Sequence, residues 1–327
     1  MNAQNETRPP KVTVIGAGTI GLGWITLFLG HGLSVTVNSR REKAPELVRE
    51  GVALYAPHLP EGTLSPDEFA PLLSFEPDID RAVANTDVVV ENAPERLELK
   101  QDLFARIGEA APPDALLLSS TSTFDPDALG ARMRYPSNLV VGHPFNPPHV
   151  VPLVEVVAGE NTTSEAVDRT MDFYRSVGRA PVLLRKPIVA FAANRLQSAL
   201  LRESVHLVRE GVVTVAELDD IVTHSIGLRW ATTGPFRAFH LGGGPGGLRA
   251  WLATLGANLD RGWELLGSPS MDEETISMLV AQADEAFGDR SYPDLVRERD
   301  NLQSAVLKAL APAAERLPDG PEEVASA

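Results

Sequence analysis

A glycine fingerprint after the first apolar run of the sequence places the strongest constraint on the fold. Gly16-Ala17-Gly18-Thr19-Ile20-Gly21 fits the pattern G-x-G-x-x-G, directly after a Val/Ile-rich run and at the start of a helical pattern. Here the first glycine permits a tight turn, the second lets the backbone approach a pyrophosphate, and the third lets helix and strand pack closely. The helix N-terminus attracts the anion. The pattern therefore predicts a dinucleotide-binding turn made by Gly16, Gly18, Thr19, Ile20 and Gly21. The alternative is a glycine-rich turn that binds no ligand.

Short Val/Leu/Ile-rich runs alternate with helical patterns from Lys11 to about Arg185, as is typical of a parallel sheet covered by crossover helices. The pattern predicts an α/β fold with a Rossmann-type, doubly wound and mostly parallel sheet. The predicted strands are Val12–Ile15, Ser34–Val37, Leu72–Phe75, Val88–Glu91, Leu116–Ser119, Leu139–Val141, Leu153–Val157 and Val182–Leu184. The predicted helices between them are Ile20–His31, Glu42–Tyr55, Arg96–Glu109 and Glu165–Val177.

Strand patterns stop after Lys186-Pro187, and only helical patterns follow. Leu241–Gly247 is rich in glycine and is predicted to be a loop. The predicted helices of this part are Val189–Glu210, Ala216–Ser225, Leu248–Leu266, Asp272–Phe287 and Leu295–Leu310. We expect a flexible leader over residues 1–10, a Rossmann NAD(P)-binding domain over 11–186, an all-α substrate and dimerisation domain over 187–311, and a disordered tail over 312–327.

Composition argues against several classes of function. The 327 residues are 43% hydrophobic and 22% charged, which is ordinary for a globular protein. A formal net charge of −15 argues against nucleic-acid binding, which requires clustered Lys and Arg. The apolar stretches fall short of the ~20 residues that span a bilayer, so we expect no membrane segment. The sequence has no cysteine and no metal-ligand spacing, so we expect no bound metal and a cytoplasmic location.

A second motif supplies side chains for acid-base chemistry. His143 stands in Gly142–Pro148, and Glu155 follows twelve residues later inside an apolar run. An unpaired carboxylate in a buried strand is energetically costly, so Glu155 should have a partner. A His-Glu pair fixes the tautomer of the imidazole and stabilises the imidazolium that forms when the ring takes a proton. The alternative is a His-Pro turn beside a buried glutamate that is hydrogen-bonded elsewhere.

The end of the second predicted strand bears on the cofactor. An Asp or Glu there binds the ribose hydroxyls of NAD, whereas neutral and basic residues hold the extra phosphate of NADP. The sequence offers Asn38, Ser39, Arg40 and Arg41. We expect NADP to be preferred over NAD, with Asn38 and Ser39 forming hydrogen bonds and Arg40 or Arg41 pairing with the phosphate. The alternative is that both arginines belong to a solvated helix start.

Several motifs in a fixed order resemble the 3-hydroxyacyl-CoA dehydrogenase superfamily, and within it the short-substrate branch of lambda-crystallin/L-gulonate 3-dehydrogenase and L-carnitine dehydrogenase. The resemblance runs nearly end to end. Besides the fingerprint it rests on Pro94–Lys100, Ser119–Thr123, His143–Pro147, Pro152–Glu155, Asn194–Gln197 and Gly227–Ala231.

The resemblance implies roles for individual residues. The catalytic set of the family falls on Ser122, His143, Glu155 and Asn194: His143 takes the hydroxyl proton, Glu155 orients it, and Ser122 and Asn194 hydrogen-bond the reacting oxygen. For Ser122 the competing interpretations are Ser119, Ser120 or a helix cap before Asp125, and for Asn194 an interhelical hydrogen bond. Glu95 and Lys100, with Ala93 beside them, match the cofactor contacts of the family, whereas a capping acid and a surface base are the alternative.

The expected activity is reversible NAD(P)-dependent oxidation of the CH-OH group of a small 3-hydroxy acid or polyol acid to its 3-keto acid. A 3-hydroxyacyl-CoA dehydrogenase is one alternative, and a non-catalytic NAD(P)-binding sensor or crystallin-like structural protein is another. The resemblance also implies a homodimer through the helical domain. The candidates to bind the substrate carboxylate are Arg195, Arg202, Arg229 and Arg237. An apolar wall or an aromatic cage for an ammonium group could be formed by Phe145, Trp230, Phe236 and Phe239, and core packing is the alternative role of these aromatic residues.

Overall fold

The computed structural model describes residues 8–314, with side chains as far as residue 311. The predicted leader and tail fall mostly outside these residues. Three residues of the predicted tail, 312–314, continue the last helix, which corrects the expected start of the tail.

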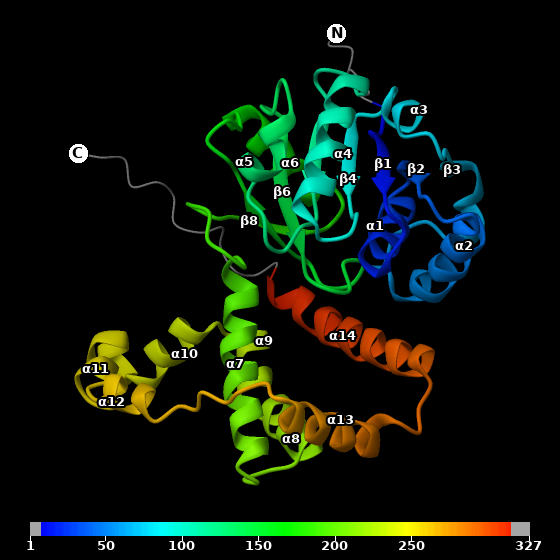
Figure 1. Ribbon diagram of the computed structural model, residues 1–327. Coiled ribbons are helices and arrows are strands. Elements are labelled where there is room, and N and C mark those ends of the chain that lie inside the picture. The colour runs from blue at the N-terminus through cyan, green and yellow to red at the C-terminus, as the bar shows by residue number, and fades with distance from the viewer. Residues whose placement is uncertain (1–7, 315–327) are drawn as a thin grey trace, which may run out of the picture. The chain divides into compact units, whose positions relative to one another are not determined.

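An eight-stranded sheet forms the centre of the first part of the chain (Figure 1). Its strand order is β3-β2-β1-β4-β5-β6-β7-β8, and every neighbouring pair is parallel except β6 and β7. The predicted doubly wound, mostly parallel sheet is therefore confirmed. The strands are β1 Lys11–Ile15, β2 Ser34–Asn38, β3 Leu73–Phe75, β4 Val88–Glu91, β5 Leu116–Ser119, β6 Leu139–Pro144, β7 Leu153–Val157 and β8 Ala180–Leu183.

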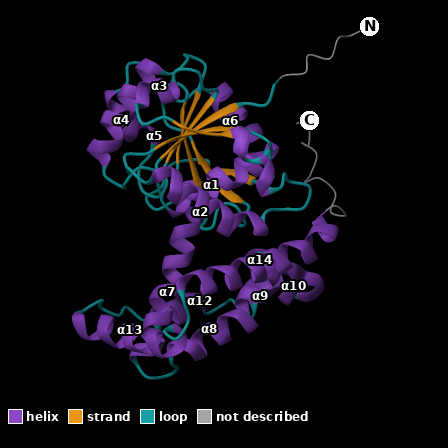
Figure 2. Cartoon of the chain, turned by 90° about the vertical axis from the view of Figure 1, so that its right-hand side faces the viewer, coloured by secondary structure: helices purple, strands orange, loops and turns teal. Residues whose placement is uncertain are grey.

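Helices cover both faces of this sheet, as Figure 2 shows with the strands in orange between purple helices. Alternate residues of each strand point to opposite faces, so β1 sends Val12 and Val14 into one hydrophobic core and Ile15 into another. The first core packs against Trp24 and Phe28, and the second against Phe104. The helices of this part are α1 Thr19–Gly30, α2 Ala44–Tyr55, α3 Ile79–Val83, α4 Leu97–Ala110, α5 Pro126–Leu129 and α6 Ser164–Ser176.

The predicted strands and longer helices of this part lie within about two residues of the observed ones, with one consequential exception. Strand β6 extends three residues beyond the predicted end at Val141 and takes in Gly142, His143 and Pro144. His143 is thus a strand residue, not a turn residue. The short helices α3 and α5 were not predicted, because one turn of helix leaves no periodic pattern.

The chain divides into two compact units. One comprises the chain up to Asn194 together with Val296–Lys308, and the other runs from Arg195 to Leu295 and resumes at Ala309. The division differs from the expected boundary at residues 186 and 187, because the middle of the last helix packs on the nucleotide-binding part: Val296 and Asp300 are both buried.

The second unit is helical, as predicted. Its helices are α7 Ala192–Arg209, which begins in the first unit, α8 Val215–His224, α9 Ile226–Thr232, α10 Pro235–Gly242, α11 Gly247–Ala253, α12 Leu259–Glu264, α13 Glu273–Phe287 and α14 Tyr292–Ala314. No helix within residues 8–314 is long and apolar enough to cross a membrane.

Two predictions in the second unit were wrong. The glycine-rich segment is not a simple loop: α10 reaches Gly242, residues Gly244–Gly246 form a 3-10 turn, and α11 starts at Gly247. The helix predicted over Leu248–Leu266 is broken into α11 and α12. At the break Gly256 approaches the ring of Trp251 so closely that a Cβ would lie 2.8 Å from it.

Candidate active site

His143 and Glu155 form a buried dyad. They are direct partners in the antiparallel pairing of β6 with β7, so both side chains leave the same face of the sheet. His143 Nδ1 lies 2.9 Å from Glu155 Oε2, and the two residues are 5% and 2% exposed. With Nδ1–H donating to the carboxylate, Nε2 is the nitrogen left to accept a proton. The partner expected for Glu155 is therefore His143, and the alternative of a turn histidine beside an independent glutamate does not describe this geometry.

The second oxygen of Glu155 holds the start of helix α7. Oε1 accepts hydrogen bonds from the backbone amides of Ala192 at 2.9 Å and Ala193 at 3.0 Å. Burial raises the pKa of Glu155, but the hydrogen bonds from His143, Ala193 and Ala192 outweigh burial and leave that pKa below its usual value. The carboxylate is thus kept ionised beside the imidazole.

Two aromatic rings enclose the histidine, and Asn194 follows in the same helix. Phe191 lies 5.3 Å and Phe145 5.9 Å from the His143 ring, measured between centroids. Asn194 stands in the first turn of α7, directly after the amides that Glu155 binds, and is half-buried. No hydrogen bond of its side chain is found within residues 8–311, so the structure offers no support for the interhelical hydrogen bond.

The segment after β5 carries three serines in different settings. Ser119 is buried and donates to Glu91 at 2.6 Å, and Ser120 accepts from the Trp24 indole at 3.0 Å. Asp125, not Ser122, caps α5 by accepting from the amide of Ala128. Among the described residues the Ser122 hydroxyl has no hydrogen-bond partner. Of the three it is the one whose hydroxyl makes no hydrogen bond to these residues, so both its donor and its acceptor remain available for a ligand.

Glu95 joins this segment to the expected cofactor side of the site. Its Oε1 accepts the amide of Ser122 at 3.1 Å and the hydroxyl of Thr121. Its Oε2 lies 3.3 Å from Lys100 Nζ. Glu95 is therefore not the cap of α4, whose N-cap residue is Arg96.

Lys100 belongs to an internal ionic network. Its ammonium donates to Glu91 at 2.7 Å and to the carbonyl of Ala93 at 3.1 Å, and it is 1% exposed. The alternative of a surface base is wrong. The same oxygen of Glu91 accepts the amide of Ala93 at 2.6 Å. Lys100 thus fixes the segment that carries Ala93 and Glu95, a setting different from the direct cofactor contact that the resemblance implies.

The fingerprint has the shape that a dinucleotide requires. Gly16 has a φ of +90°, and a Cβ there would lie 2.6 Å from the carbonyl oxygen of Asn92; a Cβ on Gly21 would lie 2.0 Å from that of Gly16. A Cβ on Gly18 would meet no atom within 4 Å. Gly18 is also the N-cap of α1 and supplies no side chain to its first amides. Open space in front of free helix amides fits a pyrophosphate, and Thr19 and Ile20 stand in the same first turn.

The end of β2 lies beside the fingerprint. The carbonyl of Asn38 accepts from the amide of Gly16 at 2.9 Å. The side-chain amide of Asn38 donates to the carbonyls of Glu76 and Pro77, so its oxygen is the atom left for a ligand. Ser39 accepts from the amide of Arg41, and Arg40 and Arg41 are exposed just before α2.

The residues considered for substrate binding divide between the units. Phe145 contacts the His143 ring, whereas Arg195, Arg202, Arg229, Arg237 and the three other aromatics stand in the second unit. Core packing is the wrong interpretation for Phe236 and Trp230, which are 78% and 43% exposed. Phe239 packs partly on Trp251, with ring centroids 4.4 Å apart.

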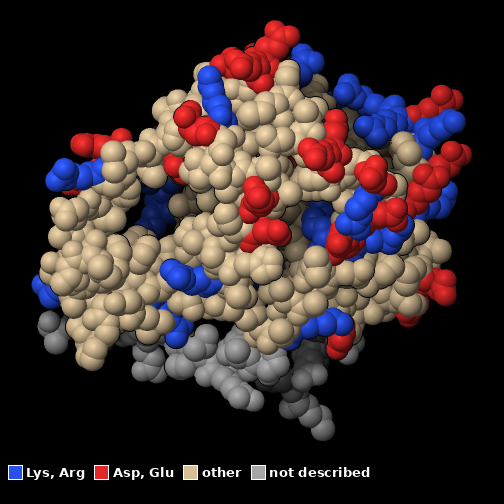
Figure 3. Space-filling view, turned by 90° about the horizontal axis from the view of Figure 1, so that it is seen from below, with Lys and Arg blue, Asp and Glu red and all other residues tan. Residues whose placement is uncertain are grey.

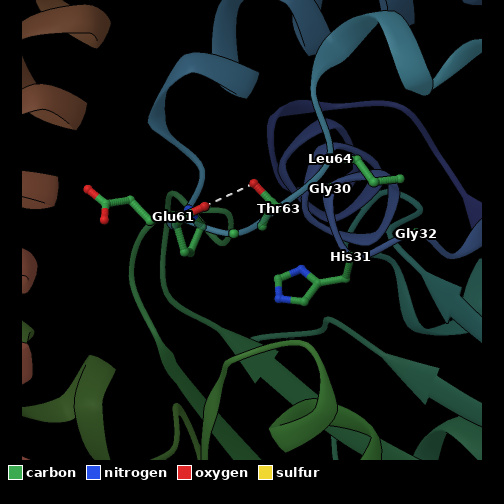
Figure 4. Close-up of a pocket in the computed structure, with 8 residues that line it drawn as sticks. Gly30, His31, Gly32, Glu61, Thr63 and Leu64 are labelled. Atoms are coloured by element: carbon green, nitrogen blue, oxygen red, sulfur yellow. Dashed lines mark hydrogen bonds between the residues drawn. The ribbon is translucent and has the colours of Figure 1, made fainter.

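Two cavities are found away from these residues. One of about 270 Å³ lies where α1 ends and is lined by His31, Glu61, Thr63 and neighbouring residues (Figure 4). The other, of about 440 Å³, lies around Lys11, Ser34 and Arg81. Neither is lined by a candidate site residue. Within residues 8–311 no cluster of His, Asp and Glu is suited to hold a metal.

Several residues that organise the site were missed in the sequence. Glu91 closes the apolar run Val88–Glu91, and the reasoning that gave Glu155 a partner applies equally to it. Thr121 and Arg179 carry no comparable signal, since their contacts depend on segments distant in sequence: Thr121 with Glu95, and Arg179 with the connection between β6 and β7.

The comparisons with known proteins agree with this geometry. Residues 11–187 match the domain described as 3-hydroxyacyl-CoA dehydrogenase, NAD binding domain, and residues 191–268 match the C-terminal domain of 3-hydroxyacyl-CoA dehydrogenase. The chain belongs to the 3-hydroxyacyl-CoA dehydrogenase family. This member of the family is an NAD(P)-dependent oxidoreductase that acts on a CH-OH group, and the resemblance seen in its sequence is confirmed.

Among curated relatives, the L-carnitine dehydrogenase of Streptomyces coelicolor is 41% identical over 313 residues, which is 96% of each chain. That of Pseudomonas aeruginosa is 42% identical over 296 residues, covering 90% of this chain and 92% of the relative. Among solved structures, 5-formyl-3-hydroxy-2-methylpyridine 4-carboxylic acid 5-dehydrogenase, an NAD+ dependent dismutase, matches with a TM-score of 0.75 and 28% identity, covering 93% of this chain and 99% of that chain.

Proposed function

We propose that the protein reversibly oxidises a small free 3-hydroxy acid to its 3-keto acid, with His143 as the proton acceptor. The hydrogen bond of 2.9 Å between His143 Nδ1 and Glu155 carries this proposal, because it leaves Nε2 free to take a proton and places a negative charge behind the ring. Glu155 holds the tautomer and stabilises the imidazolium. The proton of the substrate hydroxyl goes to His143 as the C-H bond releases a hydride.

The remaining residues bind and orient. A bound nicotinamide cofactor supplies the acceptor for the hydride. The Ser122 hydroxyl and the Asn194 amide hydrogen-bond the reacting oxygen and stabilise the charge that develops on it. The open space at Gly18 and the first amides of α1 receive the pyrophosphate. Glu95, together with Ala93 and Lys100, shapes the side of the pocket next to Ser122.

We infer that the substrate is a 3-hydroxy acid with a quaternary ammonium group, of which L-carnitine is the test compound. Support comes from the name that the relatives share and from the exposed aromatic side chains of the second unit, since cation-π contacts bind such groups. The candidates for the ammonium group are Trp230, Phe236 and Phe239, and those for the carboxylate are Arg195, Arg202, Arg229 and Arg237.

Substrate profiling tests this proposal. We expect a higher kcat/KM for L-carnitine than for 3-hydroxybutyrate, which lacks the ammonium group. Trp230→Ala should lower kcat/KM for L-carnitine and leave 3-hydroxybutyrate unaffected. Tyr292→Ala, a change of an exposed aromatic residue of the second unit, should alter neither. Reduction of acetoacetyl-CoA much faster than of any free keto acid would favour the acyl-CoA alternative. Tight cofactor binding without turnover of any hydroxy acid would favour the non-catalytic alternative.

We propose a preference for NADP over NAD. Asn38 places no negative charge at the end of β2, and Ser39, Arg40 and Arg41 offer a hydroxyl and two exposed cations next to it. The double variant R40A/R41A should lose about tenfold or more in kcat/KM with NADP, the scale of a charge-assisted hydrogen bond, and little with NAD. Arg134→Ala, at an exposed arginine next to Tyr135, is the control. A wild-type enzyme that clearly prefers NAD would contradict the proposal.

We also propose a homodimer formed through the second unit. Its strongly exposed apolar side chains include Leu196, Phe236, Leu255, Trp263 and Leu265, which are 61% to 83% exposed. Contiguous exposed apolar surface marks protein interfaces, and we infer that these side chains contribute to one. On the face in Figure 3, acidic and basic side chains are intermixed beside a broad area with few charges. Light scattering after size exclusion should give twice the chain mass for the wild type and a smaller mass for Leu265→Asp; a monomeric wild type would contradict the proposal.

A further inference from the structure

The connection of residues 145–152 joins strand β6, which carries His143, to strand β7, which carries Glu155. Register across this pair sets the distance between the two catalytic side chains, because they are opposite residues. A displacement of the connection therefore moves the dyad directly. Two groups from other parts of the sequence hold this connection in place.

The first of these groups is the guanidinium of Arg179. Its Nη1 donates to the carbonyls of Pro148 at 3.1 Å, Val151 at 3.3 Å and Val150 at 3.4 Å, and Nε donates to Val177 at 3.3 Å. Arg179 is buried and makes no ion pair within residues 8–311. Burial lowers the pKa of Arg179 to about 10, which leaves it a cation at neutral pH. Its charge is satisfied mainly by carbonyls of the connection.

The second group is Asp300, on the part of α14 that belongs to the first unit. Its Oδ2 lies 3.2 Å from Nε2 of His149, and both side chains are fully buried. The ring of Tyr55 stacks on His149 with centroids 4.3 Å apart, and a Cβ on Gly23 would lie 3.3 Å from His149 Nδ1. The imidazole is therefore enclosed between α1, α2 and α14.

The protonation of this pair follows from its surroundings. Burial lowers the pKa of His149 more than the hydrogen bond to Asp300 raises it, and Arg299 and His58 lower it further. Burial raises the pKa of Asp300, but hydrogen bonds from His149 and Arg299 leave it below its usual value. A neutral imidazole N–H of His149 therefore donates to the carboxylate of Asp300. The amide oxygen of an asparagine at residue 300 would accept the same hydrogen bond.

We propose that Asp300 is a positioning residue for the reaction: through His149 it fixes the connection between β6 and β7, and thereby the geometry of His143 against Glu155. Helix α14 lies beyond residue 268, where the match to the family's C-terminal domain ends. Under this proposal helix α14, although it lies outside that match, helps to set the geometry of the active site. The inference rests on the proposed function in taking His143 as the proton acceptor.

Three variants on α14 test the proposal in the full-length protein. Asp300→Ala removes the acceptor, and Asp300→Asn keeps one. Lys308→Gln changes another residue of α14 and breaks only its exposed ion pair with Glu61. With L-carnitine and NADP, Asp300→Ala should lower kcat about 10- to 100-fold, the scale of a small misplacement of catalytic groups, with KM and cofactor Kd unchanged. Asp300→Asn and Lys308→Gln should remain close to the wild type.

A spectroscopic measurement separates this inference from the proposed function. The Nδ1 proton of His143, assigned by its loss in His143→Gln, should shift or broaden in Asp300→Ala and not in Asp300→Asn, whether or not L-carnitine is turned over. A folded Asp300→Ala protein with wild-type kcat and an unchanged His143 resonance would overturn the proposal. If Asp300→Ala does not fold, His149→Phe takes its place, because it keeps a ring against Tyr55 and removes the N–H that binds Asp300. It should displace the same resonance and lower kcat, and it overturns the proposal if it does neither.

Discussion

Glu155 accepts a hydrogen bond from His143 with one carboxylate oxygen and from the amides of Ala192 and Ala193 with the other. The side chain that orients the imidazole therefore also holds the first turn of α7. Glu155→Gln keeps an oxygen for one of these tasks and removes the charge. We expect kcat to fall about 100-fold in Glu155→Gln, within the range of general-base catalysis. In the double variant Glu155→Gln/His143→Ala, the fold-loss in kcat should be smaller than the product of the fold-losses in the two single variants. Steady-state kinetics with L-carnitine measures this, and fully additive losses would show that the two residues do not act together.

A close contact behind the dyad gives a prediction for packing. A Cβ on Gly142 would lie 2.1 Å from the hydroxyl of Tyr174, which is buried and has no hydrogen-bond partner among the described residues. Gly142→Ala should lower the free energy of unfolding by about 1–3 kcal/mol, the usual cost of overpacking. Tyr174→Phe removes an unsatisfied hydroxyl and should be neutral or stabilising. In urea denaturation the double variant should recover part of the loss; additive effects would contradict the contact.

The buried His149 predicts how stability depends on pH. Burial holds the pKa of His149 in the folded protein below the 6.5 of an unperturbed histidine, so on acidification the unfolded chain takes up the proton first. The free energy of unfolding should fall as the pH drops below 6.5 toward the folded pKa, with a slope approaching about 1.4 kcal/mol per pH unit. Glu155 and Asp300, whose folded pKa values are also lowered, contribute at more acidic pH, below 4.5 and 3.8. Urea denaturation between pH 6.5 and pH 4.5, above the range in which these two carboxylates contribute, should show the slope in the wild type and not in His149→Gln.

The ion pair between Lys100 and Glu91 is completely enclosed, with side chains 1% and 0% exposed. Lys100→Met leaves a carboxylate buried without its cation, and such a change costs about 3–5 kcal/mol. Denaturant titration should show this loss, and the double variant with Glu91→Gln should recover a substantial part of it. Arg106→Met, which removes an exposed ion pair from the same helix, is the control and should cost about 1 kcal/mol or less.

Two of the fingerprint glycines, Gly18 and Gly21, should respond differently to substitution by alanine. A Cβ on Gly18 meets open space, whereas a Cβ on Gly21 collides with the carbonyl of Gly16. Gly18→Ala should keep the melting temperature and weaken cofactor binding, because the methyl group fills the space that the pyrophosphate needs. Gly21→Ala should lower the melting temperature. Calorimetry and cofactor titration separate the two effects; undiminished cofactor affinity in Gly18→Ala would contradict the assigned site.

Local patterns in the sequence were sufficient to predict the sheet and the dyad. Apolar runs bounded by turns identified the strands, and the cost of an unpaired buried carboxylate identified the need for a partner of Glu155. The same argument applies to Glu91 and to Lys100, one of five lysines in the sequence. Helical periodicity shows that a helix has a buried face but not what that face contacts. The packing of Val296–Lys308 on the nucleotide-binding unit, and the contacts of Asp300 and Arg179, were therefore beyond prediction.

The two tasks of Glu155 also bear on how this protein can change in evolution. A descendant that abandoned catalysis would be free to replace His143, but it would still need an acceptor for the amides that begin α7. Selection for folding alone would then preserve the acid after the reason for the imidazole had gone. Under the role that we propose for His143, the residue that marks loss of activity in a set of diverging sequences is the one at position 143, and a retained glutamate at position 155 is no evidence of a working enzyme.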